Sequence, residues 1–332
     1  MLWIVVAGTN VGSVEKSISA LEKSGEYKRN PVLADSLARL YLERCSYRAS
    51  ISDCDKAVAI YDKYVKDSNV KKAKALMRKA EIQKGREEYG GAMATYREAI
   101  STIGKGTNWE KGGMLELTRN IDLLLSAVGN YYLTKGMLAL KSDKYTEAAT
   151  YFDAAIKYLT KAKDVGLDLA RAYHGRGVAY CRSGKSDEAI EDLQRAVSLL
   201  RKLSKENAED EAVAYELGRA LYHLGNAYLK QGKYVEAAQA YEEASAAFMG
   251  IPQWQRSSKV VLAVGRTYVK RAEALHRSGK FGEAVNLYKK GIKHLKLAGK
   301  LCRKERKYCP TKGEIRSASK HLKQAKGKKE YR

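Results

Sequence analysis

Three small residues recur six times along the 332-residue chain at one fixed spacing. The second lies 12 positions after the first, and the third lies 7 positions after the second. The six sets are Ala38/Ser50/Ala57, Ala80/Ala92/Ala99, Gly136/Ala148/Ala155, Gly177/Ala189/Ala196, Gly225/Ala237/Ala244 and Ala272/Ala284/Gly291. A separation of seven is two helical turns, so the last two members share a helix face and the first lies on a preceding helix. Small side chains at facing positions allow two antiparallel helices to approach closely. The spacing therefore predicts an all-α chain, an α-solenoid of about six helix hairpins.

The sets and the turns between them predict where the hairpins begin and end. We expect hairpins near residues 31–64, 73–106, 129–162, 170–203, 218–251 and 265–298. Residues 1–30 would form a leader or capping segment, and residues 299–332 a basic C-terminal segment. Apolar residues recur at helical spacing over residues 314–326, which predicts one more helix that covers the open end of the array.

Aromatic residues accompany the small ones at fixed positions. They lie three residues before the second small residue, or four residues after it, at Tyr47, Tyr89, Tyr96, Tyr145, Phe152, Tyr234, Tyr241, Phe281 and Tyr288. Residues 221–237 combine both features and closely resemble the tetratricopeptide repeat, a resemblance that covers residues 31–298. The lengthened units are similar to those of kinesin light chains and bacterial peptide-sensing arrays. The resemblance implies a right-handed superhelix whose first helices line a concave groove for peptides or helices, with no enzymatic activity and no cofactor.

Under this resemblance, the residue six positions before the first small residue faces the groove. In the second to sixth repeats it is Lys74, Asn130, Arg171, Arg219 and Arg266. Arginine binds carboxylates and phosphates through paired hydrogen bonds, so this first row can bind an acidic or carboxylate-bearing peptide or a nucleic-acid backbone, and we predict the peptide. The alternative is a solvated rim without a ligand.

Two further sets of groove candidates follow from the resemblance. Asn226, next to the small residue Gly225, occupies a position from which family members hydrogen-bond the backbone of a ligand. A second row lies five residues after the small residue and is less specific, since basic residues there also suit a helix C-terminus: Lys141, Arg182, Lys230 and Arg277. The clamp with which heat-shock chaperone partners hold a C-terminal carboxylate is not expected, because Lys74 and Arg78 match only its last part.

The net charge of +24 is unevenly distributed. Residues 280–332 contain 18 Lys and Arg against 4 Asp and Glu. The basic tail within this segment comprises Arg303, Lys304, Arg306, Lys307, Lys320 and Lys323. Such a tail can bind RNA or a ribosome through phosphates, without reading base sequence, or it is simply a solvated surface. RNA or ribosome binding is therefore the alternative function.

The remaining sequence features argue mainly by exclusion. Five cysteines, Cys45, Cys54, Cys181, Cys302 and Cys309, form no CxxC pair and no even framework, so we expect a reducing compartment, the cytoplasm. No apolar run approaches the ~18 residues of a membrane-spanning helix. The five histidines show no metal-binding spacing, and no catalytic constellation can be identified. We therefore predict neither a metal site nor catalytic residues.

Overall fold

The structure, a computed structural model, describes residues 11–106, 114–305 and 311–330. Within these ranges there is no β-strand, and the fold is the predicted α-solenoid. The α-helices are α1 (Val11–Ser24), α2 (Pro31–Arg48), α3 (Ile51–Tyr64), α4 (Asn69–Gly85), α5 (Tyr89–Gly106), α6 (Met114–Lys141), α7 (Tyr145–Leu159), α8 (Gly166–Arg182), α9 (Ser186–Glu206), α10 (Glu211–Lys230), α11 (Tyr234–Met249), α12 (Ser258–Arg277), α13 (Phe281–Lys304) and α14 (Thr311–Glu330).

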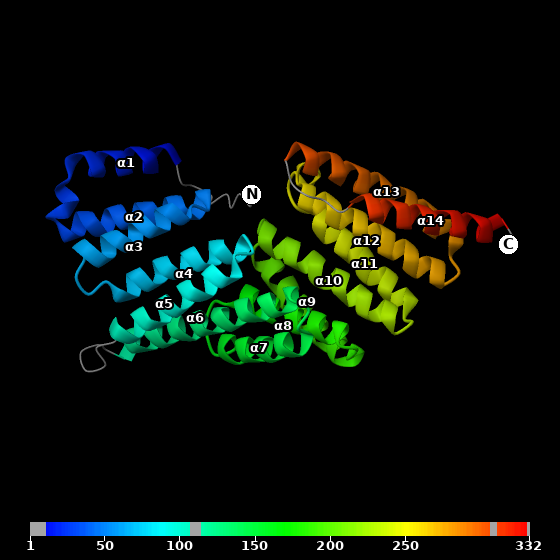
Figure 1. Cartoon of the computed structure of the whole chain (residues 1–332), viewed down its shortest axis with the longest axis horizontal. Coiled ribbons are helices and arrows are strands. Elements are labelled where there is room, and N and C mark those ends of the chain that lie inside the picture. Colours follow the sequence, from blue (N-terminus) through cyan, green and yellow to red (C-terminus); the bar gives the residue numbers. More distant parts are fainter. Residues whose placement is uncertain (1–10, 107–113, 306–310, 331–332) are drawn as a thin grey trace. The chain divides into compact units, whose positions relative to one another are not determined.

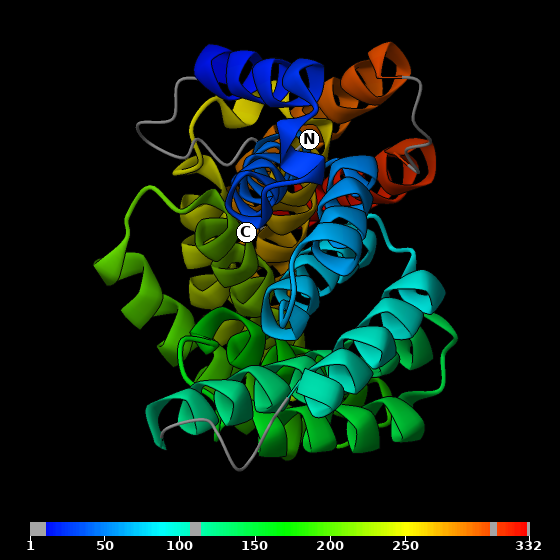
Figure 2. The same cartoon turned by 90° about the vertical axis from the view of Figure 1, so that its left-hand side faces the viewer.

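The helices form two compact units, which divide within α8. Unit 1 is Met1–Gly175 and unit 2 is Arg176–Arg332. In unit 1, consecutive helices from α1 to α7 pack against one another (Figure 1, Figure 2). In unit 2, the same holds from α9 to α14. Contacts that run mainly between neighbours are typical of a solenoid. The number of repeats and the right-handed superhelix stay predictions.

The small residues let helices approach closely, as the spacing predicted. A Cβ atom added at Gly225 would lie 2.7 Å from a ring carbon of Tyr241, and one at Gly136 would lie 2.8 Å from a ring carbon of Phe152. Both aromatic rings are fully buried. In these two hairpins, the aromatic ring on the second helix thus occupies the space that the glycine on the first helix leaves, whereas Leu193 occupies it opposite Gly177.

A further row of small residues, not anticipated from the sequence, lies one helical heptad before the first. Its members are Ala73, Gly129, Ala170, Gly218 and Gly265. A Cβ at Gly218 would lie 2.6 Å from the ring of Phe248, near the end of α11. Close approaches also occur at Gly129, opposite Leu159, and at Gly265, opposite Leu295, so the first helices α6, α10 and α12 approach their partners at this second position as well. In α14, Ala318 and Ala325 have the same seven-residue spacing and are fully buried, so α14 packs on unit 2 as another first helix would.

Glycine ends the first helices of the later hairpins, as predicted. Gly184, Gly232 and Gly279 all have positive φ angles of 75° to 87°. The corresponding turns of the second and third hairpins use Glu87 and Asp143 in the same left-handed conformation. The turn geometry is therefore kept where glycine is absent, at the steric cost of a side chain in the left-handed region.

The expectation that the cysteines are unpaired is wrong for three of them. Cys45 and Cys54 form a disulfide with a Cα–Cα distance of 5.6 Å, and Cys302 is also disulfide-bonded. Cys181 is buried as a free thiol. Cys45 lies on α2 and Cys54 on α3, so the helix–turn–helix brings two cysteines nine positions apart together, although they form no short cysteine motif. No helix in the described ranges combines the length and apolar character needed to cross a membrane.

Candidate binding groove of the first helices

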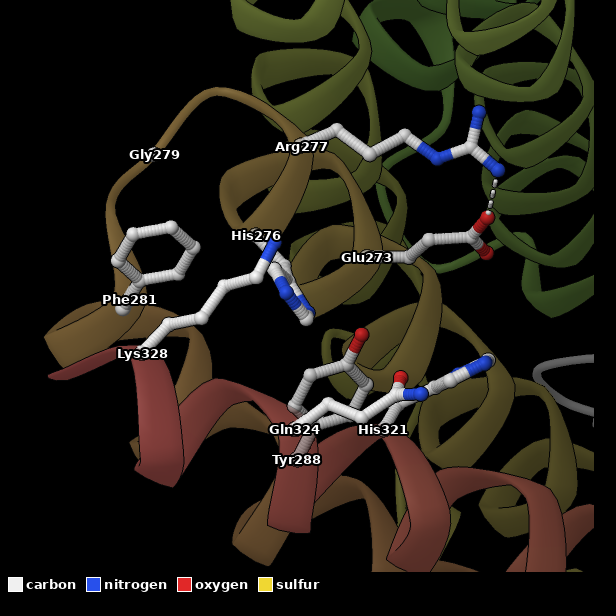
Figure 3. A pocket seen from close by; sticks show the side chains of 9 residues that line it. All are labelled: Glu273, His276, Arg277, Gly279, Phe281, Tyr288, His321, Gln324 and Lys328. Carbon is white, nitrogen blue, oxygen red and sulfur yellow. Dashed lines mark hydrogen bonds and ion pairs between the residues drawn. The ribbon is translucent and has the colours of Figure 1, made fainter.

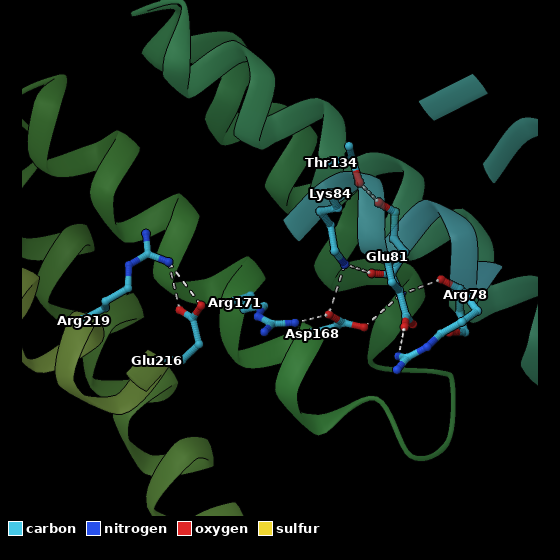
Figure 4. Close-up of polar contacts among 10 residues, drawn as sticks. Arg78, Glu81, Lys84, Thr134, Asp168, Arg171, Glu216 and Arg219 are labelled. Atoms are coloured by element: carbon cyan, nitrogen blue, oxygen red, sulfur yellow. Dashed lines mark hydrogen bonds and ion pairs between the residues drawn. The ribbon is translucent and has the colours of Figure 1, made fainter. Parts of the chain in front are cut away.

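The first row in unit 1 is largely engaged within the protein. Asn130, on α6, is only 1% exposed. Its Oδ1 accepts a hydrogen bond from Lys84 Nζ of α4 at 2.7 Å, and its Nδ2 donates to Asp168 Oδ2 of α8 at 3.0 Å. Arg171, a further member of the row, lies 3.1 Å from Asp168 Oδ1 (Figure 4). Three consecutive first helices are thus joined by one polar network.

Asp168 supplies the negative charge of this network, which it shares between Lys84 and Arg171. Lys84 Nζ lies 3.4 Å from Asp168 Oδ1, and its side chain is 7% exposed. Burial by itself would raise the pKa of the Asp168 carboxyl, but the charges of Lys84 and Arg171 and the hydrogen bond from Asn130 lower it to about 2. Asp168 is therefore ionised at neutral pH and compensates the buried ammonium group.

Lys74, the first member of the row, differs from the others in unit 1. It is exposed on α4 and forms no ion pair with any described residue. The Asn and Arg members of the row are thus engaged within the protein, whereas the lysine faces solvent.

The first row in unit 2 is more exposed, and its arginines also have carboxylate partners. Arg219, on α10, lies 3.1 Å from Glu216, one turn earlier on the same helix (Figure 4). Arg266, on α12, donates from Nε and Nη2 to Glu314 Oε1 of α14, at 3.0 and 2.6 Å. The side chains of Arg219 and Arg266 are 39% and 41% exposed. Both guanidinium groups are therefore placed to bind carboxylates and remain accessible to solvent.

Asn226, the predicted backbone-binding residue, is held by the core of its own hairpin. Its Oδ1 accepts a hydrogen bond from the hydroxyl group of Tyr241 at 2.8 Å. This contact fixes the orientation of the amide at the side of α10 that carries the row.

The second row is mixed. Lys141 forms an ion pair with Glu87 at 2.7 Å, and Arg277 forms one with Glu273 at 2.8 Å. Lys230 Nζ donates to the carbonyl oxygen of Cys181 at 2.5 Å, whereas Arg182 is exposed at the end of α8. Cys181 lies in the last turn of α8, so Lys230, at the end of α10, binds a carbonyl oxygen at the C-terminal end of another helix.

The basic tail is mostly helical and exposed. Arg303 and Lys304 are exposed at the end of α13, and Lys320 and Lys323 are exposed on α14. Arg306 and Lys307 lie outside the described residues.

Sequence reasoning missed the carboxylates that meet the predicted cations. Asp168 and Glu216 each lie three residues before an arginine of the row, a spacing that places them on one helix face and was readable from the sequence. Glu314 and Lys84 meet their partners only through tertiary packing. In the residues that the structure describes, no three His, Cys, Asp or Glu side chains gather as a metal site.

Comparisons with known proteins place this arrangement in context. Family models described as tetratricopeptide repeat match residues 128–202 and 218–245. The Hsp70-Hsp90 organizing protein of Triticum aestivum is 29% identical over 173 residues, which cover 49% of this chain and 28% of that protein. Hsp70-Hsp90 organizing protein 1 of Glycine max is 26% identical over 220 residues, which cover 63% of this chain and 36% of that protein. The chain thus spans about a third of the length of these curated relatives.

Among solved structures, the chain is similar to BtubC (BKLC) from P. vanneervenii. The two are 14% identical with a TM-score of 0.48, and the alignment covers 90% of this chain and 92% of that one.

Proposed function

Since this chain belongs to the tetratricopeptide repeat family, we propose that it is a non-catalytic interaction adaptor that binds an acidic or carboxylate-bearing peptide along its first helices. The proposal covers the first row, Asn226 and the second row as binding residues. It also keeps the division into a leader at 1–30, an array at 31–298 and a basic segment at 299–332. The names of the relatives describe an organiser of two chaperones, and an adaptor role for this chain is consistent with them.

The pairing of Arg266 with Glu314 is the observation that carries the proposal. Two nitrogens of this guanidinium group bind one carboxylate oxygen presented by a neighbouring helix. Arg266 is therefore oriented to receive a carboxylate, and a peptide carboxylate can take the place of Glu314 without a change in the arginine. Arg219 lies on α10, which contacts α12, and so extends the same cationic surface.

Unit 2 supports the proposal better than unit 1. In unit 1, Asn130 and Arg171 already hold Asp168 within a largely buried network. In unit 2, the side chains of Arg219 and Arg266 are about two-fifths exposed, so a ligand reaches them without opening the core. We therefore place the peptide along α10 and α12.

A peptide display library selected on the full-length chain tests this function. We expect enrichment of Asp, Glu or a free C-terminal carboxylate. The double variant Arg219→Gln/Arg266→Gln should weaken a selected peptide more than tenfold, because each charge-assisted hydrogen bond contributes about 1.5–3 kcal/mol. The control Arg195→Gln/Arg201→Gln removes the same charge from α9, where both side chains are exposed, and should bind normally. Selection of neutral or basic peptides, or equal loss in both variants, would overturn the proposal.

The alternative partner, RNA or a ribosome, rests on a different surface. Six basic side chains are exposed on α14 among those that the structure describes: Lys312, Arg316, Lys320, Lys323, Lys326 and Lys328. Phosphate groups suit such a surface without base recognition.

We also keep the cytoplasm as the proposed location, which requires Cys45, Cys54 and Cys302, all disulfide-bonded in the structure, to be thiols in the cell. Alkylation of thiols at the moment of cell lysis, followed by mass spectrometry, tests this location. All three cysteines should carry the alkyl group, and an intact disulfide in the trapped protein would instead favour an oxidising compartment.

A further inference from the structure

A small open cavity lies where the end of α12, the start of α13 and the last turns of α14 meet. Its volume is about 320 Å³, and its lining is dominated by polar and aromatic side chains (Figure 3). His276 comes from α12, Phe281 and Tyr288 come from α13, and His321 and Lys328 come from α14. The cavity thus collects hydrogen-bond donors from separate elements of unit 2; Arg277 of the second row also lines it, whereas Arg219 and Arg266 do not.

The negative charge in the lining is already compensated. Glu273 lies 2.9 Å from Lys270 Nζ and 2.8 Å from Arg277 Nη2. Burial would raise the pKa of the Glu273 carboxyl, but the hydrogen bond and charge of Lys270 and the charge of Arg277 outweigh this and lower it. The carboxylate therefore remains ionised and shared between two cations.

The ammonium group of Lys328 has no such partner. No carboxylate of the described residues lies within 4 Å of it, and it sits 5.6 Å from the centre of the Phe281 ring. The Lys328 side chain extends toward His276 (Figure 3). The Lys328 ammonium group thus adds a positive charge that no described carboxylate pairs with at this end of the cavity.

The His276 ring completes this donor-rich wall. Its centre lies 5.4 Å from that of Phe281 and 6.4 Å from that of Tyr288. The pKa of His276 is lowered by burial and by the charges of Lys328, His321 and Arg277, against which Glu273 acts weakly. An anion beside His276 would reverse this effect, because it stabilises the imidazolium form.

We propose that this cavity is an oxyanion site, in which Lys328, His276 and His321 bind a carboxylate or phosphoryl group against the aromatic wall of Phe281 and Tyr288. The site does not depend on the peptide-binding proposal, because a free anion is sufficient to occupy it. A metal ion would not suit it, since an ammonium group repels cations and the described residues form no metal-ligand cluster. Binding takes up a proton on His276 and is therefore tighter at acidic pH.

Titration of the full-length chain with sulfate tests the site, because sulfate keeps its charge between pH 5.5 and 7.5. We measure the ring resonances of His276 by NMR and the affinity by calorimetry, with chloride holding the ionic strength constant. Sulfate should bind saturably, raise the pKa of His276 and bind about tenfold more tightly at pH 5.5 than at 7.5. Parallel titrations with acetate and phosphate distinguish a preference for carboxylate from one for phosphoryl groups.

Two lysines of α14 provide a matched pair of variants. Lys328→Met should weaken sulfate binding about tenfold at both pH values, whereas Lys326→Met, exposed two residues away, should not. His276→Phe should remove the pH dependence. If His276→Phe unfolds by circular dichroism, the lysine pair still decides the question. Absence of saturable binding, or equal affinity in Lys328→Met and Lys326→Met, would overturn the proposal.

Discussion

At the scale of single residues, the side chain that faces a small residue decides whether a larger residue would fit there. Gly225 has no room for even one methyl group, since its Cβ would lie 2.7 Å from the buried Tyr241 ring. Gly327, also helical and in unit 2, has no neighbouring atom within 4 Å of such a Cβ. Substitution by alanine should therefore have opposite effects on stability at these two glycines.

Gly225→Ala should destabilise the protein and Gly327→Ala should stabilise it. In an open helix, alanine gains about 1 kcal/mol over glycine. At Gly225 the added methyl group displaces Tyr241, and overpacking of this kind costs about 1–3 kcal/mol. Urea unfolding of both variants, followed by circular dichroism, shows whether the free energy of unfolding falls in Gly225→Ala and rises in Gly327→Ala. A stable Gly225→Ala protein would remove the packing argument for this hairpin.

The predicted groove cations show how far residue-level reasoning reaches. The sequence identified Arg171, Arg219 and Arg266 as cations of the first helices, because a repeat fixes which side chains share a face. Their carboxylate partners followed from a three-residue spacing in two cases and from the packing of α14 in the third. The placement of these arginines on first helices was therefore predictable, whereas the pairing of Arg266 with Glu314 was not.

At the scale of helices, the fold was predictable because one short pattern repeats. The spacing of small residues predicted helix hairpins, since both close packing and the turn recur at fixed positions, and α2 and α3 form one such pair. The Cys45–Cys54 bond and the network of Lys84 and Asp168 were not predicted. Lys84 and Asp168 are 84 positions apart, and no local period specifies such a pair.

The Lys84–Asp168 network should make unit 1 less stable at acidic pH. The pKa of folded Asp168, about 2, lies below its ordinary value of 3.8, so its stabilisation is complete above about pH 4 and is lost as pH falls toward 2. The difference between these two pKa values corresponds to about 2 kcal/mol in the free energy of unfolding. Asp168→Asn should therefore lose stability at neutral pH and show a weaker decline between pH 4 and 2.

The measurement is urea unfolding at several pH values, with Glu147→Gln as the control. Glu147 is 54% exposed, and its ion pair with Lys144 is long, at 3.6 Å. Loss of its charge should therefore change the free energy of unfolding little. Combining Asp168→Asn with Lys84→Met should cost less than the sum of the two single changes, because the buried ammonium group no longer lacks its carboxylate. Strict additivity would show that the two side chains do not act together.

At the scale of the whole molecule, charge is concentrated toward the C-terminal end. Residues 280–332 carry 18 of the 62 basic residues and only 4 of the 38 acidic ones. The structure divides this charge between the folded helices α13 and α14, and the buried Ala318 and Ala325 tie α14 to its unit. Deleting the tail would therefore remove core contacts together with charge, so exchanging exposed side chains is the sharper test of nucleic-acid binding.

The triple variant Lys320→Glu/Lys323→Glu/Lys326→Glu reverses three exposed charges and leaves the buried alanines of α14 intact. If α14 binds RNA, affinity for a single-stranded homopolymer should fall, and the slope of log affinity against log salt should flatten by about 0.7 per lost phosphate contact, about 2 in total. Fluorescence anisotropy between 50 and 300 mM salt, about the range over which such contacts weaken, gives this slope.

A charge-matched control separates a local site from net charge. Each Lys→Glu exchange removes two charges, so the α14 variant falls from +24 to +18. The control Lys202→Glu/Lys205→Glu/Lys233→Glu also reaches +18, through exposed residues of α9 and of the turn before α11. If the RNA site is on α14, the α14 variant should show the full loss of RNA affinity and the control only a small one. Counterions screen charges that are more than about 10 Å away at 0.1 M salt. Equal losses would show that RNA responds only to net charge, and no binding by the unaltered chain at 50 mM salt would exclude the RNA alternative and leave the peptide adaptor.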